Sequence, residues 1–187
     1  MRFLLAFVLI VALPLSVYAT DYRGDCIIAF QGSSTLHDFH GKVRCQPFTI
    51  SSIDGVIEMS TLSVAIADMD TDNAKRDKNM REMFEENKYP LITGSAGIVA
   101  LKDIHTMQKK GTDSANKIVF KLKIRDIVKP VTATIKNFVE TDSRITADIA
   151  FTLSLAEYQL QPPSVFGMIK VDDKVSLTAT FVLNATK

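Results

Sequence analysis

The side chains best suited to chemistry lie together in a short polar stretch near the N-terminus. His37, Asp38 and His40 follow Ser33 and Ser34 within the stretch SSTLHDFH. Imidazole and carboxylate groups could hold a metal ion, or they could activate a serine as a nucleophile. In an extended chain, however, His37 and His40 point to opposite faces, and a third ligand is not evident. We therefore favour a solvated hairpin turn, in which Asp38 bonds to backbone amides, over a metal-binding or hydrolytic site here.

A second charged pair, Arg76 and Asp77, lies in a segment with helical spacing. Arginine binds phosphate groups well, so Arg76 is our candidate for contact with the head group of a ligand. The alternative is local: Asp77 helps to cap the helix while Arg76 pairs with a neighbouring carboxylate. We favour the local reading and assign no catalytic residue.

The N-terminus has the features of a secretory signal peptide. Arg2 precedes an apolar run over residues 3–13, and small residues flank the expected cleavage site in Val17-Tyr18-Ala19. The run is shorter than the ~20 residues of a spanning helix, and Pro14 interrupts it, which argues against the alternative of an uncleaved anchor. We expect residues 1–19 to be removed by cleavage after Ala19, leaving an exported domain over residues 20–187 that does not span a membrane.

The export signal changes the interpretation of the two cysteines, Cys26 and Cys45. Paired cysteines outside the cytoplasm usually form a disulfide, and a polar loop lies midway between these two. A disulfide across a first hairpin is therefore expected, with two buried thiols as the alternative. Neither cysteine belongs to a C-x-x-C motif, so we expect no metal site here.

The amino-acid composition restricts the classes of binding partner to be expected. The chain has 22 basic and 21 acidic residues, and this balance gives no reason to expect nucleic acid. Its 11 Phe and 7 Met residues are compatible with an adaptable apolar interior. The mature length is that of one ordinary domain.

Alternation of apolar and polar residues predicts a protein built mainly of strands. The pattern is clean over residues 118–124, 131–135, 145–155 and 175–183, and weaker over 26–31, 41–48, 56–67 and 91–101. A change of parity between Met59 and Leu62 indicates a bulge or bend in the third run. Eight antiparallel strands with one apolar face can form either a sandwich or a closed barrel.

Two segments break this alternation. Residues 73–87 carry Met80, Met83 and Phe84 at helical spacing before Tyr89-Pro90, which predicts a short amphipathic helix. Residues 157–170 contain consecutive prolines and should form a short helical or turn segment. Residues 102–116 are polar and are expected to form a crossover loop.

Several motifs resemble those of the YceI-like family. They are SSTLHDFHGKV at 33–43, DTDNAKRDKNMREMFEENKYPLITGSA at 70–96 and KLKIRDIVKPVTATI at 121–135. Within the central motif, Met83 stands where the family commonly has a second phenylalanine. The resemblance implies an all-β, eight-stranded antiparallel lipocalin-like barrel in the periplasm, without catalysis and without a cofactor. It also implies a polyisoprenoid or other long-chain lipid as ligand.

Such a ligand would require a dry tunnel lined by the inward side chains of the strands. We expect this lining to comprise Phe120, Leu122, Ile149, Phe151, Leu153, Leu177 and Phe181. Met80, Met83 and Phe84 would cap one mouth, and Val165, Phe166 and Met168 the other. The same residues could instead fill an ordinary core, giving a filled barrel that acts as an interaction protein. The oligomeric state stays open, with a homodimer among the possibilities.

Overall fold

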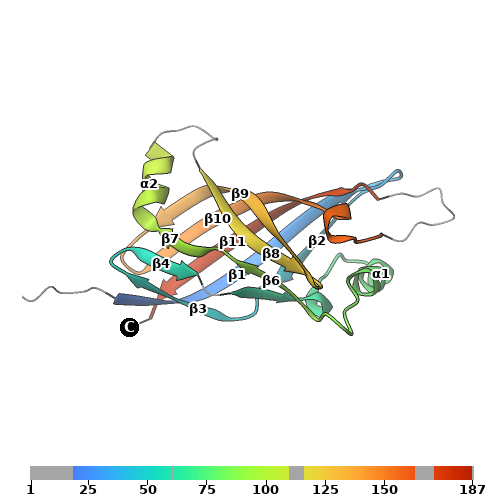
Figure 1. Cartoon of the computed structure of the whole chain (residues 1–187), viewed down its shortest axis with the longest axis horizontal. Coiled ribbons are helices and arrows are strands. Elements are labelled where there is room, and N and C mark those ends of the chain that lie inside the picture. Colours follow the sequence, from blue (N-terminus) through green and yellow to red (C-terminus); the bar gives the residue numbers. More distant parts are fainter. Residues whose placement is uncertain (1–18, 60, 110–115, 163–170, 187) are drawn as a thin grey trace, which may run out of the picture.

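A computed structural model describes residues 19–59, 61–109, 116–162 and 171–186 (Figure 1). Within them, eleven strands form one strongly curled antiparallel sheet, a half-barrel, accompanied by two short helices. The strands are β1 (Ala19–Ser33), β2 (Asp38–Arg44), β3 (Phe48–Ile53), β4 (Val56–Met59), β5 (Leu62–Ala65), β6 (Leu91–Ser95), β7 (Gly97–Ala100), β8 (Lys117–Ile124), β9 (Ile127–Glu140), β10 (Arg144–Ser154) and β11 (Lys174–Ala185). The helices are α1 (Ala74–Phe84) and α2 (Leu101–Lys109), with 3-10 turns η1 (Ile66–Asp68) and η2 (Ala156–Tyr158).

The sheet runs in the order β5-β6-β8-β9-β10-β11-β1-β3-β4-β7, and β2 pairs with β1 beside this path. All eight predicted runs contain strand, but three of them are divided, so the expectation of a regular eight-stranded closed barrel was wrong in this respect. The third run breaks into β4 and β5 where the parity of Met59 and Leu62 changes. The fourth breaks before Gly97, whose φ of 68° is a conformation that glycine favours.

The second run divides at the disulfide. Cys26 and Cys45 are bonded, with their Cα atoms 5.2 Å apart, which confirms the predicted pairing. On one side of this bond Ile27 pairs with Arg44 of β2, and on the other Gly24 pairs with Phe48 of β3. Pro47 lies between the two strands and has no backbone N–H for a ladder. The disulfide therefore joins β1 to the neighbouring segment at the point where this segment passes from β2 to β3.

Glycines lie opposite phenylalanines at three positions along β1. The directly paired residues are Gly24 with Phe48, Phe30 with Gly41, and Gly32 with Phe39. In each pair the aromatic ring occupies the space that a side chain on the glycine would need. The rings thus lie flat over the strand and keep the curled wall closely packed.

Helix α1 confirms the helix predicted over residues 73–87. The Asn73 side chain accepts a hydrogen bond from the Arg76 amide, 3.0 Å away, and so caps its N-terminus. The helix ends at Glu85, which adopts a left-handed conformation with φ of 55°. Pro90 follows before β6 begins.

The loop predicted over residues 102–116 is instead helical over Leu101–Lys109, so this expectation was wrong. Leu101 and Ile104 are buried, and they lie on one face of α2 at helical spacing. Burial of this face against the sheet stabilises a helix whose own sequence is polar. In the segment 157–170, the structure has the turn η2, while residues 163–170, including Val165, Phe166 and Met168, lie outside the described residues.

Apolar clusters fill the inside of the curled sheet at both ends, where Figure 1 shows α1 and α2. One cluster surrounds Phe84 and Tyr158 beside α1, and a second surrounds Leu101, Ile104 and Phe138 beside α2. A third, smaller cluster contains the disulfide.

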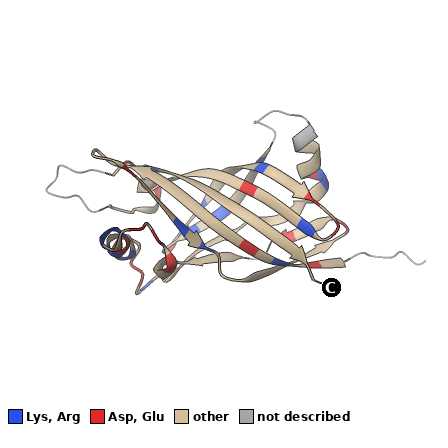
Figure 2. Cartoon of the chain, turned by 180° about the vertical axis from the view of Figure 1, so that it is seen from behind, with Lys and Arg blue, Asp and Glu red and all other residues tan. Residues whose placement is uncertain are grey.

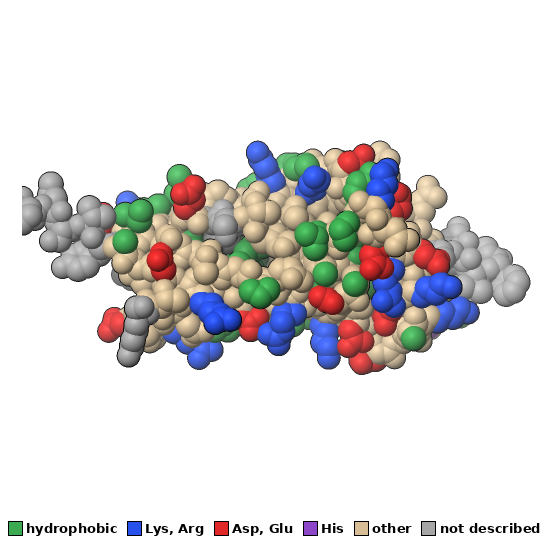
Figure 3. Space-filling view, turned by 90° about the horizontal axis from the view of Figure 1, so that it is seen from below, with side chains coloured by type: hydrophobic (Ala, Val, Ile, Leu, Met, Phe, Trp, Pro, Cys, Tyr) green, Lys and Arg blue, Asp and Glu red, His purple; other side chains and the backbone are tan. Residues whose placement is uncertain are grey.

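The outer surface mixes both signs of charge. Figure 2 shows acidic and basic positions interspersed along the strands, and Figure 3 shows hydrophobic side chains scattered among charged ones on another face. None of the helices in the described residues is long and apolar enough to cross a membrane.

We predict that Gly41→Ala lowers the free energy of unfolding by about 1–3 kcal/mol. The added methyl group would meet the Phe30 ring and lie 2.8 Å from the Asp70 carbonyl oxygen, a backbone atom that cannot rotate away. Urea unfolding measures the change. Gly94→Ala is the matched control, because its methyl group would meet nothing closer than 3.7 Å. Equal stability of the two variants would contradict the close packing described here.

Removal of the disulfide should lower stability by about 2–4 kcal/mol, because the bond restricts the unfolded chain. The test compares thermal unfolding of the wild-type protein and of a Cys26→Ser, Cys45→Ser double variant, each with and without reductant. Reductant should shift only the wild type, and it should bring the wild type down to the level of the variant. A wild type that unfolds at the same temperature in both conditions would refute a stabilising role.

Candidate functional site

The inside of the curled sheet holds a cavity of about 100 Å³ between the two end clusters. Six strands and the disulfide contribute to its wall. Its lining comprises Cys26, Ile28, Cys45, Leu62, Ser63, Val64, Ile92, Gly94, Ser95, Ala96, Ile118, Phe120, Leu122, Ile149, Phe151, Ala179 and Phe181.

The lining has almost no polar side chains. Among the described residues, Ser63 and Ser95 are its only hydroxyl groups, and it contains no charged side chain. A polar group placed here without a hydrogen-bond partner would lose its hydration at a cost of about 1–3 kcal/mol. The cavity is therefore suited to an apolar group, and its lining places no carboxylate or imidazole beside the Ser63 and Ser95 hydroxyls to act as a general base.

Five of the seven residues expected to line a tunnel surround this cavity: Phe120, Leu122, Ile149, Phe151 and Phe181. The rings of Phe120 and Phe151 meet edge to face, with centroids 5.2 Å apart. Phe181 makes a similar contact with Phe48, at 6.4 Å. Each contact joins two strands that lie one strand apart in the sheet, and the rings narrow the interior between them.

The other two expected lining residues, Leu153 and Leu177, lie outside this group. Both point inward, but they pack into the cluster beside α1 instead of onto the cavity. Sequence reasoning also missed the contributions of β1, β5 and β6, such as Ile28, Val64 and Ile92. Their inward parity was a usable signal, but the irregular pattern of the early strands obscured it.

The expected cap of Met80, Met83 and Phe84 lies at the α1 end. Phe84 is buried in the end cluster, and the two methionines pack against it while half-buried. Arg125 secures this end of the helix by donating to the Met83 carbonyl oxygen at 3.0 Å and pairing with Glu85 at 2.9 Å. The three residues thus cover one end of the interior, beyond the cavity wall.

Tyr158 is the largest fully buried side chain of this end cluster. It is 1% exposed, and its hydroxyl lies 3.4 Å from the Leu122 carbonyl oxygen, to which it donates. Burial raises the pKa of the Tyr158 hydroxyl, and the nearby Glu157 carboxylate adds to this shift. The Tyr158 side chain therefore stays neutral, and it fills the end of the interior beside α1.

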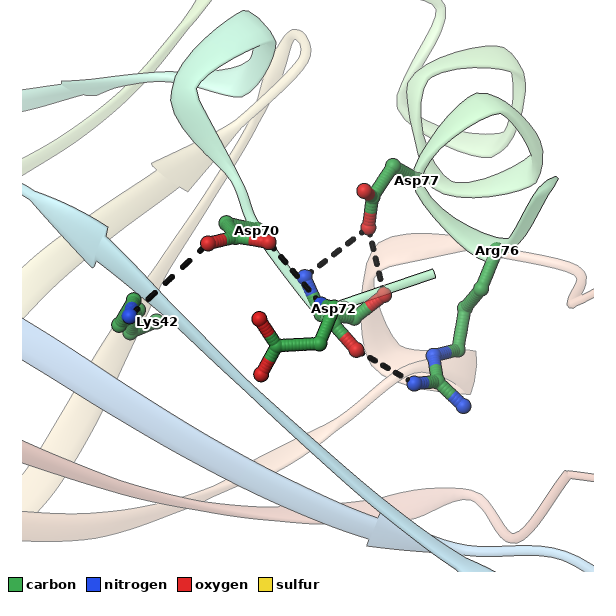
Figure 4. Close-up of polar contacts among 6 residues, drawn as sticks. Lys42, Asp70, Asp72, Arg76 and Asp77 are labelled. Carbon is green, nitrogen blue, oxygen red and sulfur yellow. Dashed lines mark hydrogen bonds and ion pairs between the residues drawn. The ribbon is translucent and has the colours of Figure 1, made fainter. Parts of the chain in front are cut away.

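Arg76 and Asp77 form the polar network drawn in Figure 4. Asp77 accepts hydrogen bonds from the amide and hydroxyl of the buried Thr71, and Arg76 donates to the Thr71 carbonyl oxygen at 2.6 Å. The Arg76 guanidinium also lies over the Phe39 ring, 5.8 Å from its centroid. Both side chains thus fasten the segment before α1, and Arg76 does not reach the cavity.

This network corrects two details of the local roles that the sequence predicted for Arg76 and Asp77. The helix cap is Asn73 and not Asp77, because Asp77 binds Thr71 ahead of the helix. The partner of Arg76 is a backbone carbonyl and not a carboxylate. The carboxylate of Asp70 instead lies 3.9 Å from Lys42 on β2, which ties the same segment to the sheet.

The polar loop at His37, Asp38 and His40 forms a turn held by Ser34. The Ser34 hydroxyl donates to the His37 carbonyl oxygen at 2.8 Å and accepts from the His37 amide at 3.3 Å. The sequence suggested Asp38 for this role. In the described part of the chain, His, Cys, Asp and Glu residues nowhere form a group of three that could hold a metal ion.

Several solved structures resemble this one, and two of them cover most of both chains. The structure of BcnA from Burkholderia cenocepacia matches with a TM-score of 0.59 at 11% identity, covering 84% of this chain and 95% of that one. A polyisoprenoid binding domain from Saccharophagus degradans, implicated in plant cell wall breakdown, matches with a TM-score of 0.61 at 13% identity, covering 90% and 100%. At these identities the likeness shows the fold alone.

Curated protein sequences provide no match. The YceI-like domain, in contrast, matches residues 25–183, which contain all but the first six residues of β1 and the last two of β11. This chain therefore belongs to the YceI-like family.

Proposed function

We propose that this protein binds a long apolar ligand, a polyisoprenoid or a similar lipid, inside the curled sheet. It acts as a binding or carrier protein of the periplasm and does not convert its ligand chemically. The observation that carries this proposal is the internal cavity, whose wall is apolar and lacks charge. The Saccharophagus degradans domain of similar fold, described as polyisoprenoid binding, supports the same ligand class.

An apolar wall can hold such a ligand without specific polar contacts. Burial of apolar surface contributes about 25 cal/mol for each Å² removed from water, so each further isoprene unit inside the wall adds to the affinity. Shape and dryness then select for chain-like hydrocarbons, since any polar group in the interior would be left unsatisfied.

The size of the cavity sets a condition on this binding. About 100 Å³ is below the roughly 300–1,000 Å³ of common small-molecule pockets. A chain of several isoprene units therefore requires the walls to separate, and the edge-to-face rings of Phe120 and Phe151 must move apart. The same small volume favours the second candidate function, a filled barrel that serves as an interaction protein.

We expect Ala179→Leu to lower the amount of lipid that co-purifies with the protein several-fold. Ala179 lies in the cavity wall between Ile28 of β1 and Ile149 of β10, so the larger side chain would fill the space. The matched control is Thr178→Leu, one residue away on the exposed face of β11. Organic extraction followed by mass spectrometry identifies and quantifies the lipid in each preparation.

Two results would count against binding in the cavity. A wild-type protein that releases no lipid on extraction would leave the filled barrel as the better account. Equal lipid in the Ala179→Leu and Thr178→Leu proteins would place the ligand elsewhere.

The proposed location has a separate test. We expect the protein, expressed as the full chain in a Gram-negative host, to be recovered from the periplasmic fraction with Thr20 as its first residue. Thr20 pairs with Ser52 of β3, so cleavage after Ala19 leaves the strand pairing of β1 intact from that residue onward. Intact-mass measurement of the fractionated protein detects the cleavage. Recovery of the uncleaved chain in the membrane fraction would show an anchor instead.

A further inference from the structure

Both ends of the cavity are closed by packed side chains. At one end Phe84 and Tyr158 are buried in the cluster beside α1. At the other, Leu101 and Ile104 of α2 are buried against Phe138. His105 adds to this second closure, with its Nε2 atom 2.6 Å from a Glu140 carboxylate oxygen and its ring edge-on to Phe138. A ligand that entered through either end would have to displace a core cluster.

The side wall is weaker in one place. Strands β6 and β8 pair from Thr93 with Lys123 to Ser95 with Lys121. Beyond Ser95, the described residues show no pairing between β7 and β8, although the antiparallel register would bring Gly97–Ala100 alongside residues 116–119. There β7 pairs only with β4, and β8 only with β9. Figure 1 shows β8 diverging from β7 along this stretch, which we name the seam.

The cavity reaches this seam. Ser95 and Ala96, at the point where the pairing ends, line the cavity, as does Ile118 on the opposite side. A side chain added at Gly97 would meet no atom within 4 Å. The space beside the end of the β6–β8 ladder is therefore open, and it adjoins the apolar interior.

The edges of β7 and β8 that border the seam, which we call its lips, expose apolar side chains. Ile98 on β7 is 73% exposed, and Val119 on β8 is 61% exposed. Exposed aliphatic residues lower the cost of moving a hydrocarbon chain from one apolar environment to another. A seam without a hydrogen-bonded ladder can also widen without leaving buried backbone groups unpaired.

We propose that the apolar ligand enters and leaves the cavity through the seam between β7 and β8. This inference rests on the proposed function, and it adds the route to the site. The cluster beside α1 then stays packed during exchange, while the two strands that border the seam separate to admit the chain. Val99 of β7 and Ile118 of β8, which pack against the cluster beside α2, move apart with their strands.

A bulky group attached to one lip tests this route. Because Cys26 and Cys45 are bonded to each other, a Val119→Cys variant has a single reactive thiol that a polyethylene glycol maleimide modifies selectively. The apolar fluorophore N-phenyl-1-naphthylamine serves as the probe, and stopped-flow fluorescence gives its association and dissociation rates. The control is Val128→Cys with the same modification, since Val128 is 52% exposed on β9 and opposite Lys123, away from the seam.

Modification at residue 119 should slow association and dissociation alike, by about tenfold, and leave the Kd unchanged. An obstructed route has this signature because it raises one barrier without changing the bound or the unbound state. Modification at residue 128 should alter neither rate. If both modified proteins exchange the probe as fast as the wild type, the seam is not the route, while the proposed binding stands. If the wild type does not bind the probe at all, the proposed function fails and the route fails with it.

Discussion

Strand β1 is the constraint on which the rest of the wall depends. One edge pairs with β11 and the other with β2 and then β3, so a single strand sets the register of both halves of the curl. The change of partner occurs at Cys26 and Cys45, where the disulfide holds the two segments together. The same cysteines form part of the cavity wall. The bond between Cys26 and Cys45 therefore fixes the change of strand partner along β1 and also one part of the cavity wall.

Much of this architecture follows from local pattern in the sequence. Alternation located the eight runs of strand, and the spacing of Met80, Met83 and Phe84 located α1. The expected export, together with the polar loop between the two cysteines, predicted their pairing. Each of these features is decided by neighbours along the chain. The helix α2 was missed because Leu101 and Ile104 are too few to reveal an apolar face without the cluster that buries them.

Features that depend on distant residues could not be predicted in this way. Leu153 and Leu177 share the inward parity of Phe151 and Ala179, yet they lie beside α1 and not on the cavity. Parity assigns a side chain to a face of the sheet, but its height along the wall depends on the stagger between strands. The seam is a property of the same kind, because it begins where the pairing of Ser95 with Lys121 ends. No local pattern records where two strands separate.

The seam also bears on the small volume of the cavity. In a fully laddered wall, admitting a long chain would require backbone hydrogen bonds to break, and each buried group left unpaired costs about 1–3 kcal/mol. Where β7 and β8 are not paired, the wall can move apart while the ladders of β7 with β4 and of β8 with β9 stay intact. The route and the expansion are then one motion: separation of the lips admits the chain and moves the walls apart. The small volume of the cavity fits such a mechanism, because apolar walls gain contacts by approaching each other.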